Sequence, residues 1–164
     1  MGLAPDPRLI LREEELDAAL ELLFLAEAAL WAGADAALEA EPAGLGRTHY
    51  RILFLLKRRP GLGVRELARL MALSKQGASR ALGDLERRGL VAKSAGEDAR
   101  RRPAALTPEG AALEASVSER LRAQVARAYR AGGLDAVPGA RRILEALAGG
   151  RLALARAGHA ANER

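Results

Sequence analysis

The 164-residue sequence predicts a mainly α-helical fold with one small β-hairpin. Ala and Leu dominate while aromatic residues make up only 3% of the chain, and this composition favours helices over sheets. Apolar residues recur at three- and four-residue steps through most of the chain, as they do on one face of a helix. Between residues 90 and 106, two short apolar segments flank a charged loop, which predicts the hairpin.

The N-terminal part of the chain predicts one long helix over residues 9–37. Its larger apolar side chains follow helical spacing: Leu16, Leu20, Leu23, Phe24, Leu30 and Trp31. The Pro and Gly residues of segment 40–47 end this helix. At 1.5 Å per residue it would span ~40 Å, which exceeds what a small domain covers. We therefore expect residues 1–45 to form a contact between subunits.

The C-terminal part predicts two further helices, over residues 107–131 and 135–157, separated by a Gly-Gly pair. Thr107 would cap the first of them, with Pro108 in its first turn. Both helices carry apolar stripes that have little of this chain left to pack against. We therefore expect residues 111–164 to supply further dimerisation helices, so that the protein is a homodimer.

Between these parts, residues 46–110 predict a compact lobe. Three helices and two strands are expected there, over residues 49–59, 64–72, 75–88, 90–93 and 104–106. Thr48 and Ser74 would cap the first and third helices, and Gly89 would end the third. Two helices joined by a tight turn and followed by a hairpin make a winged helix-turn-helix, a unit that reads duplex DNA.

Positive charge is concentrated in this lobe. The chain has 26 Lys and Arg against 21 Asp and Glu, for a net charge of +5. Residues 46–110 hold 15 of the basic residues and only 6 of the acidic ones, so the remainder of the chain is mildly acidic. This asymmetry predicts a polyanion-binding lobe carried by a scaffold that does not bind.

The helix predicted over residues 75–88 has the chemistry to read bases. Its apolar residues Ala78, Leu82 and Leu85 share one face. On the opposite face, Gln suits adenine while Arg or Lys suits guanine in the major groove. The candidate DNA-binding residues here are Ser74, Lys75, Gln76, Ser79 and Arg80. The alternative interpretation is an ordinary solvated helix face.

The loop between the predicted strands places Arg100, Arg101 and Arg102 side by side. Three adjacent like charges repel one another, which favours a polyanionic partner. A narrow minor groove attracts arginine through its negative potential, and Asp98 is near enough in sequence to hold one of the arginines by hydrogen bonding. The alternative interpretation is a solvated basic loop.

In its motifs and their order, the chain over roughly residues 46–112 resembles the MarR family of winged helix-turn-helix transcriptional regulators. The resemblance is carried by residues 51–91, by Asp-Ala-Arg at 98–100 and by Leu-Thr-Pro-Glu-Gly at 106–110. In that family an Asp-x-Arg stands eight residues before a Leu-Thr-x-x-Gly, and here Asp98 stands eight residues before Leu106.

The resemblance implies a homodimer whose lobes bind successive major grooves of a near-palindromic operator. It implies that Arg100 enters the minor groove with Asp98 orienting it, and that Arg101 and Arg102 contact phosphate or support the loop. The expected function is a sequence-specific transcriptional regulator, a repressor that a small aromatic or anionic effector releases from DNA.

The resemblance also implies an effector site between the dimer region and the lobe. Four residues are candidates for that junction: Trp31, His49, Tyr50 and Arg51. Each has a structural alternative. Trp31 would then be part of the core, while His49 and Arg51 would satisfy a helix cap or bridge a partner.

Other functions lack residues to support them. The absence of cysteine excludes disulfides, thiolate metal sites and a cysteine nucleophile. His49 and His159 are far apart in sequence, so no metal site, no cofactor and no enzymatic activity are predicted. The N-terminus lacks the pattern of a secretory signal, and no apolar run is long enough for a membrane span, so a cytoplasmic protein is expected. The competing hypothesis is a winged-helix protein-interaction module that binds no DNA.

Overall fold

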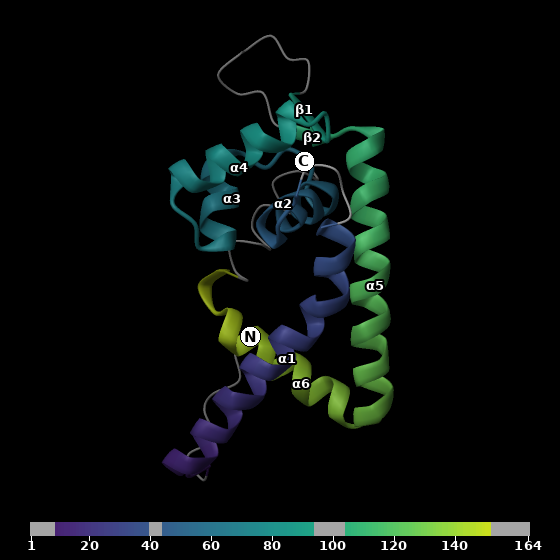
Figure 1. Cartoon of the computed structure of the whole chain (residues 1–164). Helices are drawn as coiled ribbons and strands as arrows, with labels where there is room; N and C mark the ends of the chain where they lie inside the picture. Colours follow the sequence, from purple (N-terminus) through teal and green to yellow (C-terminus); the bar gives the residue numbers. More distant parts are fainter. Residues whose placement is uncertain (1–8, 40–43, 94–103, 152–164) are drawn as a thin grey trace.

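The computed structural model describes residues 9–39, 44–93 and 104–151. Within these ranges the chain forms helices and one two-stranded antiparallel sheet (Figure 1). In chain order the elements are α1 (Glu13–Glu39), α2 (Arg47–Arg58), α3 (Val64–Met71), α4 (Lys75–Arg87), β1 (Val91–Lys93), β2 (Ala104–Leu106), α5 (Pro108–Gly132) and α6 (Ala136–Ala148). The mainly α-helical fold with a small hairpin is therefore confirmed.

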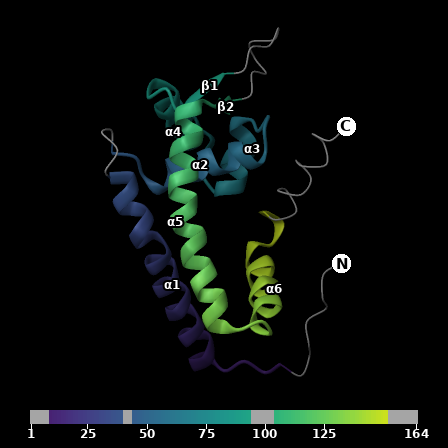
Figure 2. The ribbon, with the colours of Figure 1, turned by 90° about the vertical axis from the view of Figure 1, so that its right-hand side faces the viewer.

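The elements divide into a compact lobe and a group of long helices (Figures 1 and 2). α2, α3, α4 and the hairpin pack together, and the first half of α5 runs along them. The second half of α5 extends beyond the lobe, with α1 beside it and α6 folded back from its end (Figure 2). The core lies where the lobe meets α5, and its largest fully buried apolar side chains are Leu38, Ile52, Leu53, Leu67, Leu85 and Val117.

The first helix of the lobe begins earlier than the sequence predicted. Gly46, not Thr48, is the N-cap of α2. The imidazole of His49 makes the difference, because its Nδ1 accepts a hydrogen bond from the Gly46 N–H at 3.1 Å. A side chain three residues into the helix thus satisfies the capping residue's own amide, and Thr48 lies within the first turn.

The turn between α3 and α4 is held by hydrogen bonds at both helix ends. Ala72 takes a left-handed conformation, with φ of 54°, and the Leu73 N–H donates to the Ala68 carbonyl at 2.9 Å. Two residues later, the Ser74 hydroxyl accepts from the Gly77 N–H at 2.9 Å and caps α4, as predicted. These adjacent caps fix the angle between the two helices of the helix-turn-helix.

A close backbone contact ties the hairpin to α5. The Thr107 hydroxyl donates to the Gly89 carbonyl at 2.7 Å and accepts from the Gly110 N–H at 3.1 Å, while the Thr107 N–H donates to the Leu90 carbonyl at 3.1 Å. A Cβ atom on Gly110 would lie only 1.9 Å from the Leu90 oxygen. The Leu-Thr-x-x-Gly motif therefore holds the start of α5 against the residues before β1. Its threonine hydrogen-bonds both segments, and only glycine fits at position 110.

The two strands of the hairpin pair in register, with Val91 opposite Leu106 and Lys93 opposite Ala104. Val91 and Ala104 are buried and anchor the strands to the lobe. The loop that joins them lies outside the described residues, and with it four of the predicted DNA-binding residues: Asp98, Arg100, Arg101 and Arg102.

The long helices leave much apolar surface uncovered. The side chains of Leu20, Phe24, Ile143 and Leu147 are all exposed, and α6 has no buried residue. α1 begins at Glu13, later than the predicted residue 9, because the Glu15 carboxylate accepts the Arg12 N–H at 2.9 Å and caps the helix there. None of the described helices has the length and hydropathy for a membrane span.

Candidate nucleic-acid interface and ligand cavity

The first two turns of α4 form an exposed polar surface. The side chains of Lys75, Gln76, Ser79 and Arg80 are exposed and together line a shallow depression. Within the described ranges neither Lys75 nor Arg80 pairs with a carboxylate. The structure therefore brings together four of the five predicted residues of this helix, with their donors free for an outside partner.

Ser74 and the C-terminal half of α4 play internal roles. The Ser74 hydroxyl is committed to the helix cap. Farther along, Asp84 accepts from Arg87 Nη2 at 2.9 Å and from Arg88 Nε at 3.0 Å, so both arginines have a carboxylate partner within the lobe. Among the basic residues of α4, those without a carboxylate partner in the described ranges, Lys75 and Arg80, thus lie at its N-terminal end, where the helix dipole also favours an anion.

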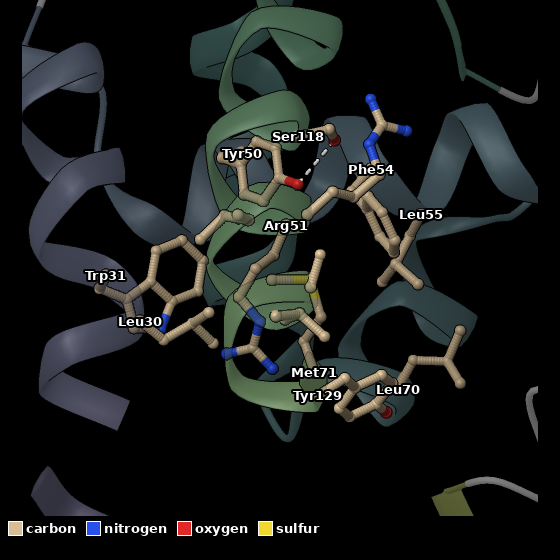
Figure 3. Close-up of a pocket in the computed structure, with 14 residues that line it drawn as sticks. Leu30, Trp31, Tyr50, Arg51, Phe54, Leu55, Leu70, Met71, Ser118 and Tyr129 are labelled. Atoms are coloured by element: carbon tan, nitrogen blue, oxygen red, sulfur yellow. Dashed lines mark hydrogen bonds between the residues drawn. The ribbon is translucent and has the colours of Figure 1, made fainter. Parts of the chain in front are cut away.

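A second candidate site is a cavity of about 580 Å³ between the lobe and the long helices (Figure 3). Its lining comes from α1, α2, α3 and α5 and is mostly apolar: Leu30, Trp31, Phe54, Leu55, Leu70, Met71, Leu121, Val125, Ala126 and Tyr129. Tyr50, Arg51, Ser118 and Arg122 supply its polar groups. The size and lining are typical of a small-molecule site.

The polar groups of the cavity favour an anionic ligand. Arg51 from α2 and Arg122 from α5 both line it, and within the described ranges neither has a carboxylate partner. Figure 3 shows the Arg51 side chain reaching across the cavity from α2. Two unpaired guanidinium groups beside an apolar wall suit a ligand with an acidic group and an aromatic or aliphatic body.

Trp31 of α1 is fixed in the cavity wall by contacts with residues of α2. Arg47 donates to the Asp35 carboxylate from both Nε, at 2.9 and 3.2 Å, and Nη2, at 2.6 Å. Its Nη1 reaches Glu27 at 2.9 Å. Its guanidinium lies 5.3 Å from the Trp31 ring centroid, and the Trp31 ring packs edge-on against Tyr50 at 5.9 Å. The hydrogen bond from Arg47 is the main reason that the pKa of Asp35 lies below its usual value.

A buried hydrogen-bonded chain runs from the cavity wall into the contact between α2 and α5. The Tyr50 and Ser118 hydroxyls are 2.8 Å apart. Ser118 also bonds the Glu114 carboxylate, which in turn pairs with the Lys57 ammonium. Burial raises the pKa of Tyr50, so its hydroxyl stays protonated at neutral pH.

His49 does not line the cavity, unlike the other three residues predicted for the effector site. Its Nε2 lies 3.1 Å from Asp84 Oδ2 on α4, and its Nδ1 accepts from Gly46. Because Nδ1 accepts, the neutral imidazole carries its proton on Nε2 and donates it to Asp84. Burial lowers the pKa of His49 despite the nearby Asp84 carboxylate. The structure thus gives His49 the capping and bridging role that was its alternative.

Two polar residues of the cavity were not predicted from the sequence. Ser118 and Arg122 lie on α5, about seventy residues along the chain from Tyr50 and Arg51. The signal that could have found them is a polar stripe at four-residue spacing beside the apolar stripe of α5, with Glu114 as its first member.

Comparison with known proteins assigns the fold and the family. The sequence model described as MarR family matches residues 43–102. The HTH-type transcriptional regulator PetP of Rhodobacter capsulatus is 38% identical over 140 residues, which is 85% of this chain and 83% of PetP.

Solved structures of the MarR family protein Rv2887 of Mycobacterium tuberculosis also match. In its complex with salicylic acid it is 31% identical with a TM-score of 0.58, covering 84% of this chain and 97% of Rv2887. In its complex with DNA it is 33% identical with a TM-score of 0.57, covering 77% and 94%.

The resemblance read from the winged-lobe motifs is therefore confirmed. The family and the name of the curated relative are those of transcriptional regulators rather than of enzymes. This chain, with its helix-turn-helix, short hairpin and long flanking helices, belongs to the MarR family.

Proposed function

We propose that the protein is a DNA-binding transcriptional regulator that binds a pseudo-palindromic operator as a homodimer and is released from it by a small anionic effector. The observation that carries the DNA-binding part is the exposed N-terminal surface of α4. There Lys75, Gln76, Ser79 and Arg80 offer hydrogen bonds that nothing in the described chain uses. A helix of this kind enters the major groove with its N-terminal residues on the base edges.

The homodimer is supported by the uncovered apolar surface of α1 and α6. Ile143, Leu144 and Leu147 are each more than half exposed, and Leu16, Leu20 and Phe24 are exposed on α1. Soluble proteins rarely leave so many large apolar side chains in water unless another surface covers them. A two-fold arrangement through these helices would carry two copies of α4, matching two half-sites.

The effector is supported by the cavity at the junction of lobe and long helices. Its apolar wall and its two unpaired arginines suit a small aromatic acid, and the related Rv2887 has been solved with salicylic acid. An effector bound there would contact α2 of the lobe and α5 of the dimer region at once, so it could favour one arrangement of the lobes over another. Release of the protein from DNA when the effector binds would make it a repressor. Such a protein would act in the cytoplasm, where the chromosome lies.

A pair of charge-matched variants tests DNA binding. Operator fragments are first selected from a genomic library, and affinities are then measured by fluorescence anisotropy at several salt concentrations. Arg80→Ala removes a cation from the α4 surface and should weaken operator binding by about 1–3 kcal/mol if it reads a base. Arg130→Ala removes an exposed cation from the far end of α5 and should bind like the unaltered protein. Equal affinities for the two variants, or no selected duplex at low salt, would count against the proposal and favour a protein-interaction module.

A further inference from the structure

Tyr50, Ser118 and Glu114 form a row of hydrogen bonds beside the cavity. The charge of Glu114 fixes which group donates and which accepts in this row. Glu114 is 2% exposed, and its carboxylate pairs with the Lys57 ammonium. An ionised carboxylate can only accept hydrogen bonds, so Ser118 must donate its single hydroxyl proton to Glu114.

That commitment decides the orientation of the Tyr50 hydroxyl. Because the Ser118 proton is directed at Glu114, the 2.8 Å contact between Tyr50 and Ser118 forms only if Tyr50 donates and Ser118 accepts. The phenolic proton of Tyr50 is therefore committed to Ser118 and is not available to a ligand. The Tyr50 oxygen retains lone pairs and no proton for a ligand.

The polar edge of the cavity consequently has two different kinds of group. Arg51 and Arg122 are donors only, and they suit the acidic group of a ligand. Tyr50 is an acceptor, and Figure 3 shows its hydroxyl at the edge of the cavity, turned toward Ser118. A ligand that fills both sites needs an anionic group and, separately, a hydrogen-bond donor such as a hydroxyl.

We propose that Ser118 and Glu114 are positioning residues that set ligand specificity: by committing the Tyr50 proton to Ser118, they make the protein prefer aromatic acids that carry a hydroxyl donor over matched acids that do not. The inference rests on the proposed effector site and specifies its ligand class. A ligand without the donor covers the Tyr50 oxygen but leaves its accepting lone pairs without a hydrogen bond, which is the usual basis for rejecting an analogue.

The test compares the three positional isomers of hydroxybenzoate with the fluorobenzoates that carry fluorine at the same positions, by titration calorimetry on the full-length dimer. Fluorine is close in size to hydroxyl and has no proton to donate. At least one hydroxybenzoate should bind about three- to tenfold more tightly than its fluoro partner, the ratio that one neutral hydrogen bond supplies.

Two variants then test whether the preference for hydroxybenzoate comes from the hydrogen bonds of Ser118 and Glu114. Ser118→Ala removes the acceptor for Tyr50, and Glu114→Gln introduces an amide that can donate to Ser118. Either change lets the Tyr50 proton turn toward the cavity, so the affinity ratio of each hydroxybenzoate to its fluoro partner should fall to about twofold or less. Glu114 does not line the cavity, so Glu114→Gln should still bind benzoate. Ser116→Ala, an exposed serine on the same helix, should keep the original ratio.

The outcomes separate this inference from the function on which it rests. If the unaltered protein binds these acids with no hydroxyl preference, or if both variants retain the preference, the positioning role is wrong and the effector site stands. If it binds none of the acids, the effector site itself is wrong, and the inference with it. Benzoate binding shows whether a variant keeps an intact cavity. If both variants fail to fold, the ratio of hydroxybenzoate to fluorobenzoate affinity in the unaltered protein still decides whether the hydroxyl preference exists.

Discussion

At Gly110 the backbone of α5 passes against the carbonyl of Leu90 with no room for a side chain. The 1.9 Å separation from the Leu90 oxygen that a Cβ would have is far inside van der Waals contact. The neighbouring Thr107 bonds both segments, so neither can withdraw without losing hydrogen bonds. This one glycine therefore sets how the hairpin sits on the long helix.

Gly110→Ala should lower the free energy of unfolding by about 3 kcal/mol or more, because the segments must separate at a fully bonded joint. Gly83→Ala is the matched control, since a Cβ at that helical position meets nothing within 4 Å. It should stabilise the protein by up to about 1 kcal/mol through helix propensity. Urea denaturation followed by circular dichroism measures both. A Gly110→Ala variant as stable as the parent would show that the joint yields easily.

His49 is a second residue whose role is set by its neighbours. It links the N-terminus of α2 to Asp84 on α4, with Arg88 beside the same carboxylate. Protonation of Nδ1 would abolish its bond to the Gly46 N–H. Burial lowers the pKa of His49 in the folded protein below the ordinary value of a histidine.

A lowered pKa means that the folded protein holds fewer protons than the unfolded chain just below pH 6.5, so stability must fall as the pH drops through that window. Unfolding free energies measured at pH 7.5, 6.5 and 5.5 should therefore decrease on acidification. His49→Gln keeps a polar side chain that does not titrate there, and its curve should be flatter. Parallel curves for the two proteins would exclude His49 as the source.

At the scale of elements, the helix-turn-helix is determined mostly by short-range signals. The apolar faces of α2, α3 and α4 could be predicted from spacing alone, and Ser74 and Thr107 cap the helices as expected. The start of α2 could not be predicted from spacing, because its cap depends on the imidazole of His49. The place of Ser118 and Arg122 in the cavity could not be predicted either, since packing of α5 against α2 brings them there from a distant part of the chain.

One short-range feature of the turn is strained. Ala72 has a φ of 54°, in the left-handed region that favours glycine. Its side chain is exposed, so nothing is gained from its Cβ. Ala72→Gly should raise the free energy of unfolding by roughly 0.5–1 kcal/mol, after allowing for the greater freedom of glycine in the unfolded chain. Thermal denaturation measures the change; a lower midpoint would mean that the turn relaxes in solution.

At the scale of the whole molecule, the apolar side chains of α1 and α6 are the largest feature without an internal explanation. Leu144 on α6 is 54% exposed, and none of the helix is buried in the single chain. A charge placed on a surface that packs against a second copy would be desolvated without a partner.

Leu144→Glu should therefore shift the protein toward monomer, with the apparent dissociation constant raised by about tenfold or more. Ser116→Glu adds the same charge at an exposed position of α5 near the lobe and should leave the dimer intact. Sedimentation velocity over a concentration series distinguishes the two. Monomeric parent protein at all concentrations would refute the dimer.

The length of α5 has a mechanical consequence. One uninterrupted helix of 25 residues joins the base of the hairpin to the turn before α6, which makes it a rod ~37 Å long. Tilting such a rod by about 5° would displace its far end by ~3 Å, comparable to the rise of one base pair. If the proposed effector binds near the midpoint of α5, turning the helix by only a few degrees would be enough to move α4 out of register with the major groove.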